Sequence, residues 1–152
     1  MGVLGRYPVH FHMIHDAVGE GMYAKDNSIH DVFQRCVVIH GTDGVLVKDN
    51  VAFNTNGHCY FLEDGCEMYN TFDHNLGINA HGVGDWEDPR QIIPTDSSPS
   101  MFWITNPMNT WTNNAAVCPL LSMKVDKYRC LPSLDIGFLC QIKLLDCLHL
   151  SM

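Results

Sequence analysis

Four stretches of the sequence decide its fold: Tyr23-Ala-Lys-Asp-Asn-Ser-Ile29, Leu46-Val-Lys-Asp-Asn-Val-Ala52, Thr71-Phe-Asp-His-Asn-Leu-Gly77 and Thr110-Trp-Thr-Asn-Asn-Ala-Ala116. Each has asparagine as its fifth residue, and Asn27, Asn50 and Asn75 follow one another at spacings of 23 and 25 residues. Asn114 comes 39 residues after Asn75, which corresponds to one repeat plus an insertion. Repeats of this length are typical of a solenoid, in which turns join short strands into stacked coils.

The residues between the asparagines predict short strands and tight turns. Runs rich in β-branched and aromatic residues occur at 36–40, 44–47 and 59–62, and Asx-Gly turn signals follow or precede them. Coils stacked about 4.8 Å apart let equivalent Asn side chains hydrogen-bond from one coil to the next. We therefore predict an all-β fold, a right-handed parallel β-helix of about four coils over residues 1–117. The Leu spacing of a leucine-rich solenoid does not recur, and a β-sandwich would not explain the regular asparagines.

Two parts of the chain depart from the repeat. The segment 81–100 is rich in Gly, Pro, Asp and Ser. We predict that it is a long loop inserted at one edge of the helix, and loops of this length are commonly functional. Over residues 118–152 the repeat signature disappears, while Leu and Cys become frequent. We interpret 118–152 as a divergent tail of aberrant or disordered sequence, with a genuine C-terminal cap as the alternative.

The composition excludes several classes of protein. The formal net charge of −8 disfavours nucleic-acid binding, which needs Lys and Arg to neutralise phosphates. No apolar run is long enough to span a membrane, and none of signal-peptide length begins the chain. Seven Cys without a CxxC spacing do not predict a structural zinc site. Cys36 and Cys59, one repeat apart, are expected to lie adjacent inside the helix, either as a disulfide or as stacked thiols.

Several longer motifs together resemble one family. They are Gly5–His12, Ser28–Cys36, Ile39–Gly44, Gly57–Gly65, Asn70–Gly77 and Phe102–Asn109. In this order they resemble the β-helix region of the family of cell-surface and cell-migration-inducing hyaluronidases and fibrocystin-L. The resemblance runs from about Gly5 to Val117 and includes neither the family's G8 domain nor a membrane anchor.

The resemblance implies that the chain is a fragment of an extracellular or cell-surface protein that degrades hyaluronan by endo-type hydrolysis. Its partner would be hyaluronan or a related glycosaminoglycan, its parent could be membrane-anchored, and calcium is the candidate cofactor. The alternative is a non-catalytic glycan-binding or adhesion module, as in a fibrocystin-L-like ectodomain. As an isolated fragment the chain is expected to be an inactive glycoside hydrolase, and open coil ends could prevent stable folding.

The candidate catalytic residues are Glu63, Asp64, His40 and His12. Glycoside hydrolysis needs two carboxyl groups beside the scissile bond, and neighbouring coils can supply them; Asp43 and Asp64 both precede Gly and are expected to stack. Glu63 would point to the opposite face from Asp64 if the strand continues there. His10 and His12 flank Phe11 and so share a face, and His40 is expected near His12 and Glu63. Such a cluster could perform acid/base chemistry or hold a metal of unknown identity.

The candidate substrate-binding residues are Arg6, His10, Arg35 and Lys48. A uronate carboxylate needs positive charge, and basic residues are few in this chain. Lys25 and Lys48 occupy equivalent repeat positions, where the simplest expectation is that they pair with Asp26 and Asp49 in solvent. Trp86, in the predicted loop, could stack on a sugar ring or anchor the loop.

Overall fold

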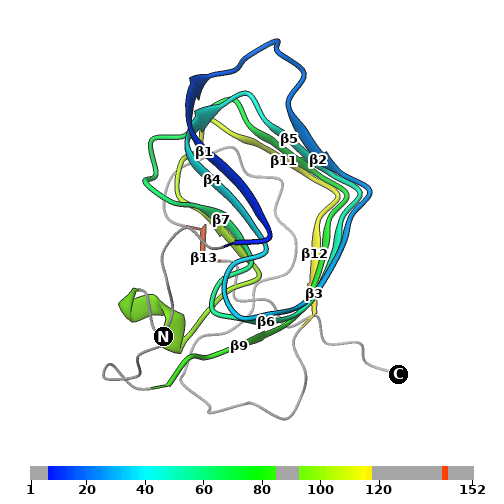
Figure 1. Cartoon of the computed structure of the whole chain (residues 1–152), viewed down its shortest axis with the longest axis vertical. Helices are drawn as coiled ribbons and strands as arrows, with labels where there is room; N and C mark the ends of the chain where they lie inside the picture. The colour runs from blue at the N-terminus through cyan, green and yellow to red at the C-terminus, as the bar shows by residue number, and fades with distance from the viewer. Residues whose placement is uncertain (1–6, 85–92, 118–141, 144–152) are drawn as a thin grey trace.

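The computed structural model describes residues 7–84, 93–117 and 142–143. From residue 9 to residue 117 the chain passes through twelve short strands that repeat in groups of three, so that each coil supplies one strand to each of three sheets (Figure 1). All pairs among these strands are parallel. The fold is therefore the predicted parallel β-helix, with four coils.

The three sheets are named here by the order in which the first coil enters them. Sheet 1 contains β1 (Val9–Asp16), β4 (Val37–Asp43), β7 (Tyr60–Leu62), β10 (Phe102–Ile104) and β13 (Ile142–Lys143), and β13 pairs antiparallel with β10. Sheet 2 contains β2 (Tyr23–Lys25), β5 (Leu46–Lys48), β8 (Thr71–Asp73) and β11 (Thr110–Thr112). Sheet 3 contains β3 (Ser28–Val32), β6 (Val51–Asn56), β9 (Leu76–His81) and β12 (Ala115–Val117).

The predicted asparagine ladder runs through all four coils at the corner between sheets 2 and 3. The amide nitrogens of Asn27, Asn50 and Asn75 each donate to the amide oxygen of the next ladder asparagine, at 2.8, 2.9 and 2.9 Å. The residue before each ladder asparagine has a positive φ between 54° and 58°. Asp, Asn and His, which occupy these positions, are the side chains best tolerated there. The ladder thus satisfies buried amides and fixes the bend between sheets 2 and 3 in every coil.

A second, shorter asparagine column was missed from the sequence. Asn70 accepts a hydrogen bond from the Val45 backbone N–H at 2.8 Å, and Asn109 accepts one from the Asn70 N–H at 3.0 Å. The signal was present, because Asn70 and Asn109 have the same spacing of 39 residues as Asn75 and Asn114. This column holds the turn that leads into sheet 2.

Side chains that point into the coils form apolar stacks. In sheet 1, Val37, Tyr60 and Phe102 share one register position and are at most 1% exposed. The rings of Tyr60 and Phe102 stack with centroids 4.6 Å apart. Beside this layer Cys36 and Cys59 form a disulfide and are fully buried. Of the two arrangements expected for these cysteines, the structure therefore has the disulfide.

Two expectations about stacked charges were wrong. Asp43 pairs in register with Asp16, and on its other side it accepts a hydrogen bond from the Met68 N–H at 2.7 Å, so it does not stack on Asp64. Lys48 lies in register with Lys25, and Lys25 pairs with Asp26 at 3.5 Å as expected, but the Lys48 ammonium group binds Asp73 of the next coil at 2.5 Å rather than Asp49. The cause in both cases is the parallel register, which places side chains of adjacent coils side by side, whereas successive residues of one strand point to opposite faces.

The insertion begins one residue later than predicted and packs back onto the helix. β9 ends at His81, and within 82–100 a short 3-10 helix, η1 (Pro94–Ser97), is described. Asp96 of η1 is fully buried against the coils. Apart from β13, the predicted tail lies outside the described residues. No helix in the described part of the chain is long and apolar enough to cross a membrane.

Candidate functional site: a cleft and a histidine cluster on sheet 1

The outward-pointing residues of sheet 1 form two rows across the coils. The parallel register places His10, Val38, Phe61 and Trp103 side by side in the first row. In the second row His12 lies in register with His40. Because successive residues of a strand point to opposite faces, both rows lie on the face away from the core. The predicted common face of His10 and His12 is confirmed.

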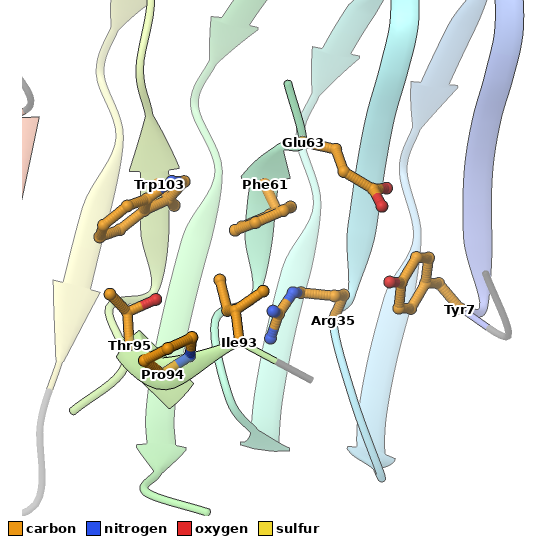
Figure 2. Close-up of a pocket in the computed structure, with 8 residues that line it drawn as sticks. All are labelled: Tyr7, Arg35, Phe61, Glu63, Ile93, Pro94, Thr95 and Trp103. Carbon is orange, nitrogen blue, oxygen red and sulfur yellow. The ribbon is translucent and has the colours of Figure 1, made fainter. Parts of the chain in front are cut away.

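A cleft of about 310 Å³ opens on this face beside the first row. Its lining residues are Tyr7, Arg35, Phe61, Glu63, Ile93, Pro94, Thr95 and Trp103 (Figure 2). Figure 2 shows Phe61 and Trp103 side by side on neighbouring strands, with Ile93 and Pro94 of the insertion facing them. The insertion therefore forms one wall of the cleft, which supports the expectation that this loop has a role beyond connection.

Arg35 lines the cleft, but its positive charge is already paired with a carboxylate. Its guanidinium group donates to Asp96 at 2.6 Å, and its Cζ lies 4.4 Å from the centre of the Phe61 ring. Arg35 and Asp96 are 1% and 0% exposed. A Cβ atom at Gly57, where φ is +75°, would lie only 2.6 Å from the Arg35 guanidinium. The pair therefore fixes the insertion against the coils, and glycine at position 57 makes room for it.

His58 supports the aromatic wall and was not identified from the sequence. It is fully buried, and its ring centroid lies 4.5 Å from that of Trp103. The Ser100 N–H donates to His58 Nδ1 at 3.0 Å, so the proton of the neutral ring is on Nε2, which faces the Thr95 hydroxyl oxygen at 3.0 Å. Its position directly before a buried strand, next to Cys59, was the available signal.

The three histidines expected to come together do so. The ring centroids of His12 and His40 are 4.7 Å apart, those of His10 and His12 4.9 Å, and those of His10 and His40 6.1 Å. His12 Nδ1 and His40 Nδ1 are 3.0 Å apart. The cluster is partly open to solvent, because His12 is exposed while the other two are half-buried.

Both candidate carboxylates reach the same imidazole. Glu63 Oε2 lies 3.6 Å from His40 Nδ1, and Asp64 Oδ2 lies 3.0 Å from His40 Nε2. β7 ends at Leu62, so the strand geometry that would have sent Glu63 and Asp64 to opposite faces does not apply. The Glu63 side chain is 14% exposed and that of Asp64 47%. Two carboxylates in different environments thus flank one histidine at the end of the cleft.

The remaining predicted residues are not part of this cluster. Lys48 is on sheet 2, paired with Asp73, and the structure does not bring it to the cleft. The hydrogen bond to Lys48 holds the pKa of Asp73 well below its usual value. Arg6 and Trp86 lie outside the described residues.

Calcium does not fit the ligand sets that the described residues offer. Two clusters of candidate metal ligands occur among them: His10, His12 and His40, and Asp64, Cys66 and Glu67. Ca²⁺ takes about six to eight oxygen ligands, whereas the first cluster offers ring nitrogens. In the second, the Glu67 carboxylate already accepts three backbone N–H bonds at 2.8–3.1 Å. No role for calcium is therefore derived.

Four coils of parallel strands, an internal asparagine ladder and a largely aromatic and apolar cleft on one outer sheet define a parallel β-helix protein with a surface site. The chain belongs to the CEMIP β-helix family, whose family model matches residues 1–119. It is 39% identical over 143 residues to the human cell surface hyaluronidase CEMIP2, covering 74% of this chain and 10% of that protein.

Two further relatives show how widely the segment occurs. The mouse cell migration-inducing and hyaluronan-binding protein is 39% identical over 137 residues, covering 75% of this chain and 10% of its own length. A G8 domain-containing protein of Dictyostelium discoideum is 40% identical over 126 residues, covering 75% of this chain and 8% of its own length. The chain thus spans about a tenth of the length of the curated relatives that it matches.

Proposed function

We propose that the outer face of sheet 1 is a hyaluronan site of an extracellular or cell-surface protein, where the polymer is bound and hydrolysed. The observation that carries this proposal is the convergence of Glu63 and Asp64 on His40 at the end of an aromatic cleft. The names of the relatives, which include hyaluronidases and a hyaluronan-binding protein, support the choice of polymer.

The cleft suits a sugar chain better than a compact anion. Phe61 and Trp103 present neighbouring rings along the direction in which the coils stack, and aromatic faces stack on the apolar faces of sugar rings. Arg35 packs against the Phe61 ring, and its guanidinium group is paired with the Asp96 carboxylate. The imidazoles of His10, His12 and His40 lie next to Glu63 at the edge of the cleft, where their ring N–H groups can donate hydrogen bonds to a uronate carboxylate.

The carboxylates can divide the two tasks of glycoside hydrolysis. In the proposed reaction the exposed Asp64 protonates the leaving glycosidic oxygen as the bond from it to the anomeric carbon breaks. Water forms the new bond to that carbon and gives up a proton to the Glu63 carboxylate. His40 contacts both groups and holds them on opposite sides of its ring. A ring between them favours the wider carboxyl spacing of inverting enzymes, about 6.5–9.5 Å, over the narrower one of retaining enzymes.

Binding is tested on the chain itself. Titration with hyaluronan oligosaccharides, followed by tryptophan fluorescence and calorimetry, should show saturable binding. Trp103→Ala should weaken it about tenfold or more, since loss of a stacked ring costs about 1–3 kcal/mol by analogy with base stacking. Trp111→Ala serves as the control, because Trp111 lies on sheet 2. A folded chain that does not bind would overturn the proposal.

Hydrolysis is tested in the setting of the whole protein. Residues 1–119 replace the matching segment of full-length human CEMIP2, and depolymerisation of hyaluronan is followed by light scattering after size-exclusion chromatography. Asp64→Asn should lower the rate about 10²–10⁴-fold, the usual contribution of a general acid. Asp31→Asn removes a comparable exposed Asp–His pair, formed with His30 on sheet 3, and should leave the rate unchanged. Binding without cleavage would instead establish the non-catalytic module.

A further inference from the structure

We infer that His10, His12, His40 and Glu63 form a binding site for a divalent transition metal ion, with Zn²⁺ as the ligand that fits best. The four residues come from three adjacent strands or strand ends of sheet 1, and Glu63 also lines the cleft. The inference concerns metal binding and does not require that the site hydrolyse hyaluronan.

The fold brings the donor atoms together without a dedicated loop. His12 and His40 are direct register partners on β1 and β4, and His10 is two residues before His12 on the same face. Ligand atoms of the three histidines all lie within 4.8 Å of one another. Because the strands are held by the ladder and by the buried core, this convergence belongs to the rigid part of the molecule.

The distances between donors are close to those of a tetrahedral site. With Zn–N bonds of about 2.0–2.1 Å, neighbouring donors in a tetrahedron are about 3.3 Å apart. His12 Nδ1 is 3.0 Å from His40 Nδ1, and Glu63 Oε2 is 3.6 Å from His40 Nδ1 and 3.9 Å from His10 Nε2. Rotations about the side-chain bonds would draw the three imidazole nitrogens, which now lie within 4.8 Å of one another, and the Glu63 carboxylate toward one ion.

Asp64 orients His40 for this role. While Asp64 is ionised its carboxylate can only accept, so the contact of 3.0 Å between Asp64 Oδ2 and His40 Nε2 favours the tautomer with the ring proton on Nε2. The Nδ1 lone pair of the neutral ring then points toward His12 and Glu63. Histidines that bind metals usually have such a carboxylate on the other ring nitrogen, which fixes the tautomer and strengthens the ligand.

Glu63 supplies an independent indication of a cation. Its Oε2 atom is buried and has no hydrogen-bond partner among the described residues, although it faces two imidazoles at 3.6 and 3.9 Å. A buried carboxylate oxygen without a hydrogen bond is costly, and a bound cation would satisfy it. The ion would also place positive charge on a chain of net charge −8, next to the cleft where we propose that a polyanion binds.

Ligand chemistry selects the metal. Three imidazole nitrogens and one carboxylate oxygen suit borderline ions such as Zn²⁺, whereas Mg²⁺ and Ca²⁺ require oxygen ligands. With four protein ligands the tetrahedron is complete, so a zinc-bound water would require a fifth coordination position, and there its pKa would fall to about 7. In the proposed hydrolysis such a water would stand on the Glu63 side of the cluster, and Asp64 would keep its place beside the leaving oxygen.

The test uses the full chain, stripped with a chelator and titrated with ZnCl₂ by calorimetry. We expect one Zn²⁺ per chain that survives gel filtration. His40→Gln should weaken binding by about 100-fold or more, and Asp64→Asn by about 10–100-fold as the partner of a ligand. His74→Gln is the matched control, because His74 also pairs with an aspartate but lies at the corner that follows β8, away from sheet 1. Circular dichroism checks that each variant is folded.

Substitution with Co²⁺ provides a readout that needs no variant. Intense visible bands without thiolate charge-transfer absorption would indicate a tetrahedral site of nitrogen and oxygen ligands. Thiolate bands would place the metal on cysteines, and the absence of binding in the micromolar range would leave the histidines as a hydrogen-bonded cluster; either result overturns the inference. Zinc binding with no effect of chelation on hyaluronan hydrolysis would sustain the metal site and refute its part in the reaction.

Discussion

Replacement of Asn50 by alanine should destabilise the β-helix far more than the same change at Asn27, although both belong to one ladder. The Asn50 side chain accepts hydrogen bonds from the Asn27 backbone N–H at 3.1 Å and side-chain amide at 2.8 Å. It donates to the Ala24 carbonyl and to Asn75 Oδ1, both at 2.9 Å. Asn50 is 1% exposed, so water cannot replace these bonds.

The magnitude follows from the groups left without partners. Asn50→Ala strands the Asn27 N–H and removes the hydrogen bonds to the Ala24 carbonyl and to Asn75 Oδ1. At about 2 kcal/mol for the stranded group and about 1 kcal/mol for each of the other two bonds, the loss is about 4 kcal/mol. Asn27→Ala removes one side-chain hydrogen bond at the first coil and strands no backbone group, which corresponds to about 1 kcal/mol. The expected difference of about 3 kcal/mol is large against a typical total stability of about 5–15 kcal/mol.

Urea unfolding followed by far-ultraviolet circular dichroism measures both changes. The midpoint should fall in each variant while the slope with urea stays the same, because the surface exposed on unfolding is unchanged. Equal losses for the two variants, within about 0.5 kcal/mol, would refute the reasoning. Such a result would mean that the ladder amides are solvated or that the coils relax to repair the gap.

Three further predictions concern stability. Joint replacement of Cys36 and Cys59 by alanine should cost about 3.4 kcal/mol from the loop of 23 residues that the disulfide closes, measured by urea unfolding of samples whose thiol content is known. Gly57→Ala should cost about 3 kcal/mol, because a positive φ and the clash with the buried ion pair act together. Gly19→Ala is the control: φ is +86° and the space is open, so only the backbone strain of about 1 kcal/mol is expected. The hydrogen bond from Lys48 lowers the pKa of Asp73 in the folded state. The contribution of the ionised Asp73 to the free energy of unfolding is therefore present above the ordinary pKa of 3.8 and is lost as the pH falls below it. Asp73→Asn should therefore make the free energy of unfolding less dependent on pH in the acid range.

The coil architecture could be predicted from local sequence because each coil places an asparagine at the same position of its bend. Asn27, Asn50 and Asn75 recur at near-constant spacing, and an amide that must be satisfied in every layer leaves such a trace. The common face of His10 and His12 was equally accessible, since it depends only on the alternation of side chains along one strand. What the sequence determined by itself is thus the fold class and the local geometry of single strands.

The site depended on the tertiary structure. The pairing of Arg35 with Asp96 joins residues 61 positions apart across an insertion with no repeat, and nothing local to either residue indicates the other. Whether Glu63 and Asp64 point apart or toward His40 depended on where β7 ends, which is set by the turn that follows it. Register between coils decides such contacts, because a parallel strand meets residues a whole coil away, and a shift of one residue moves every side chain to the other face.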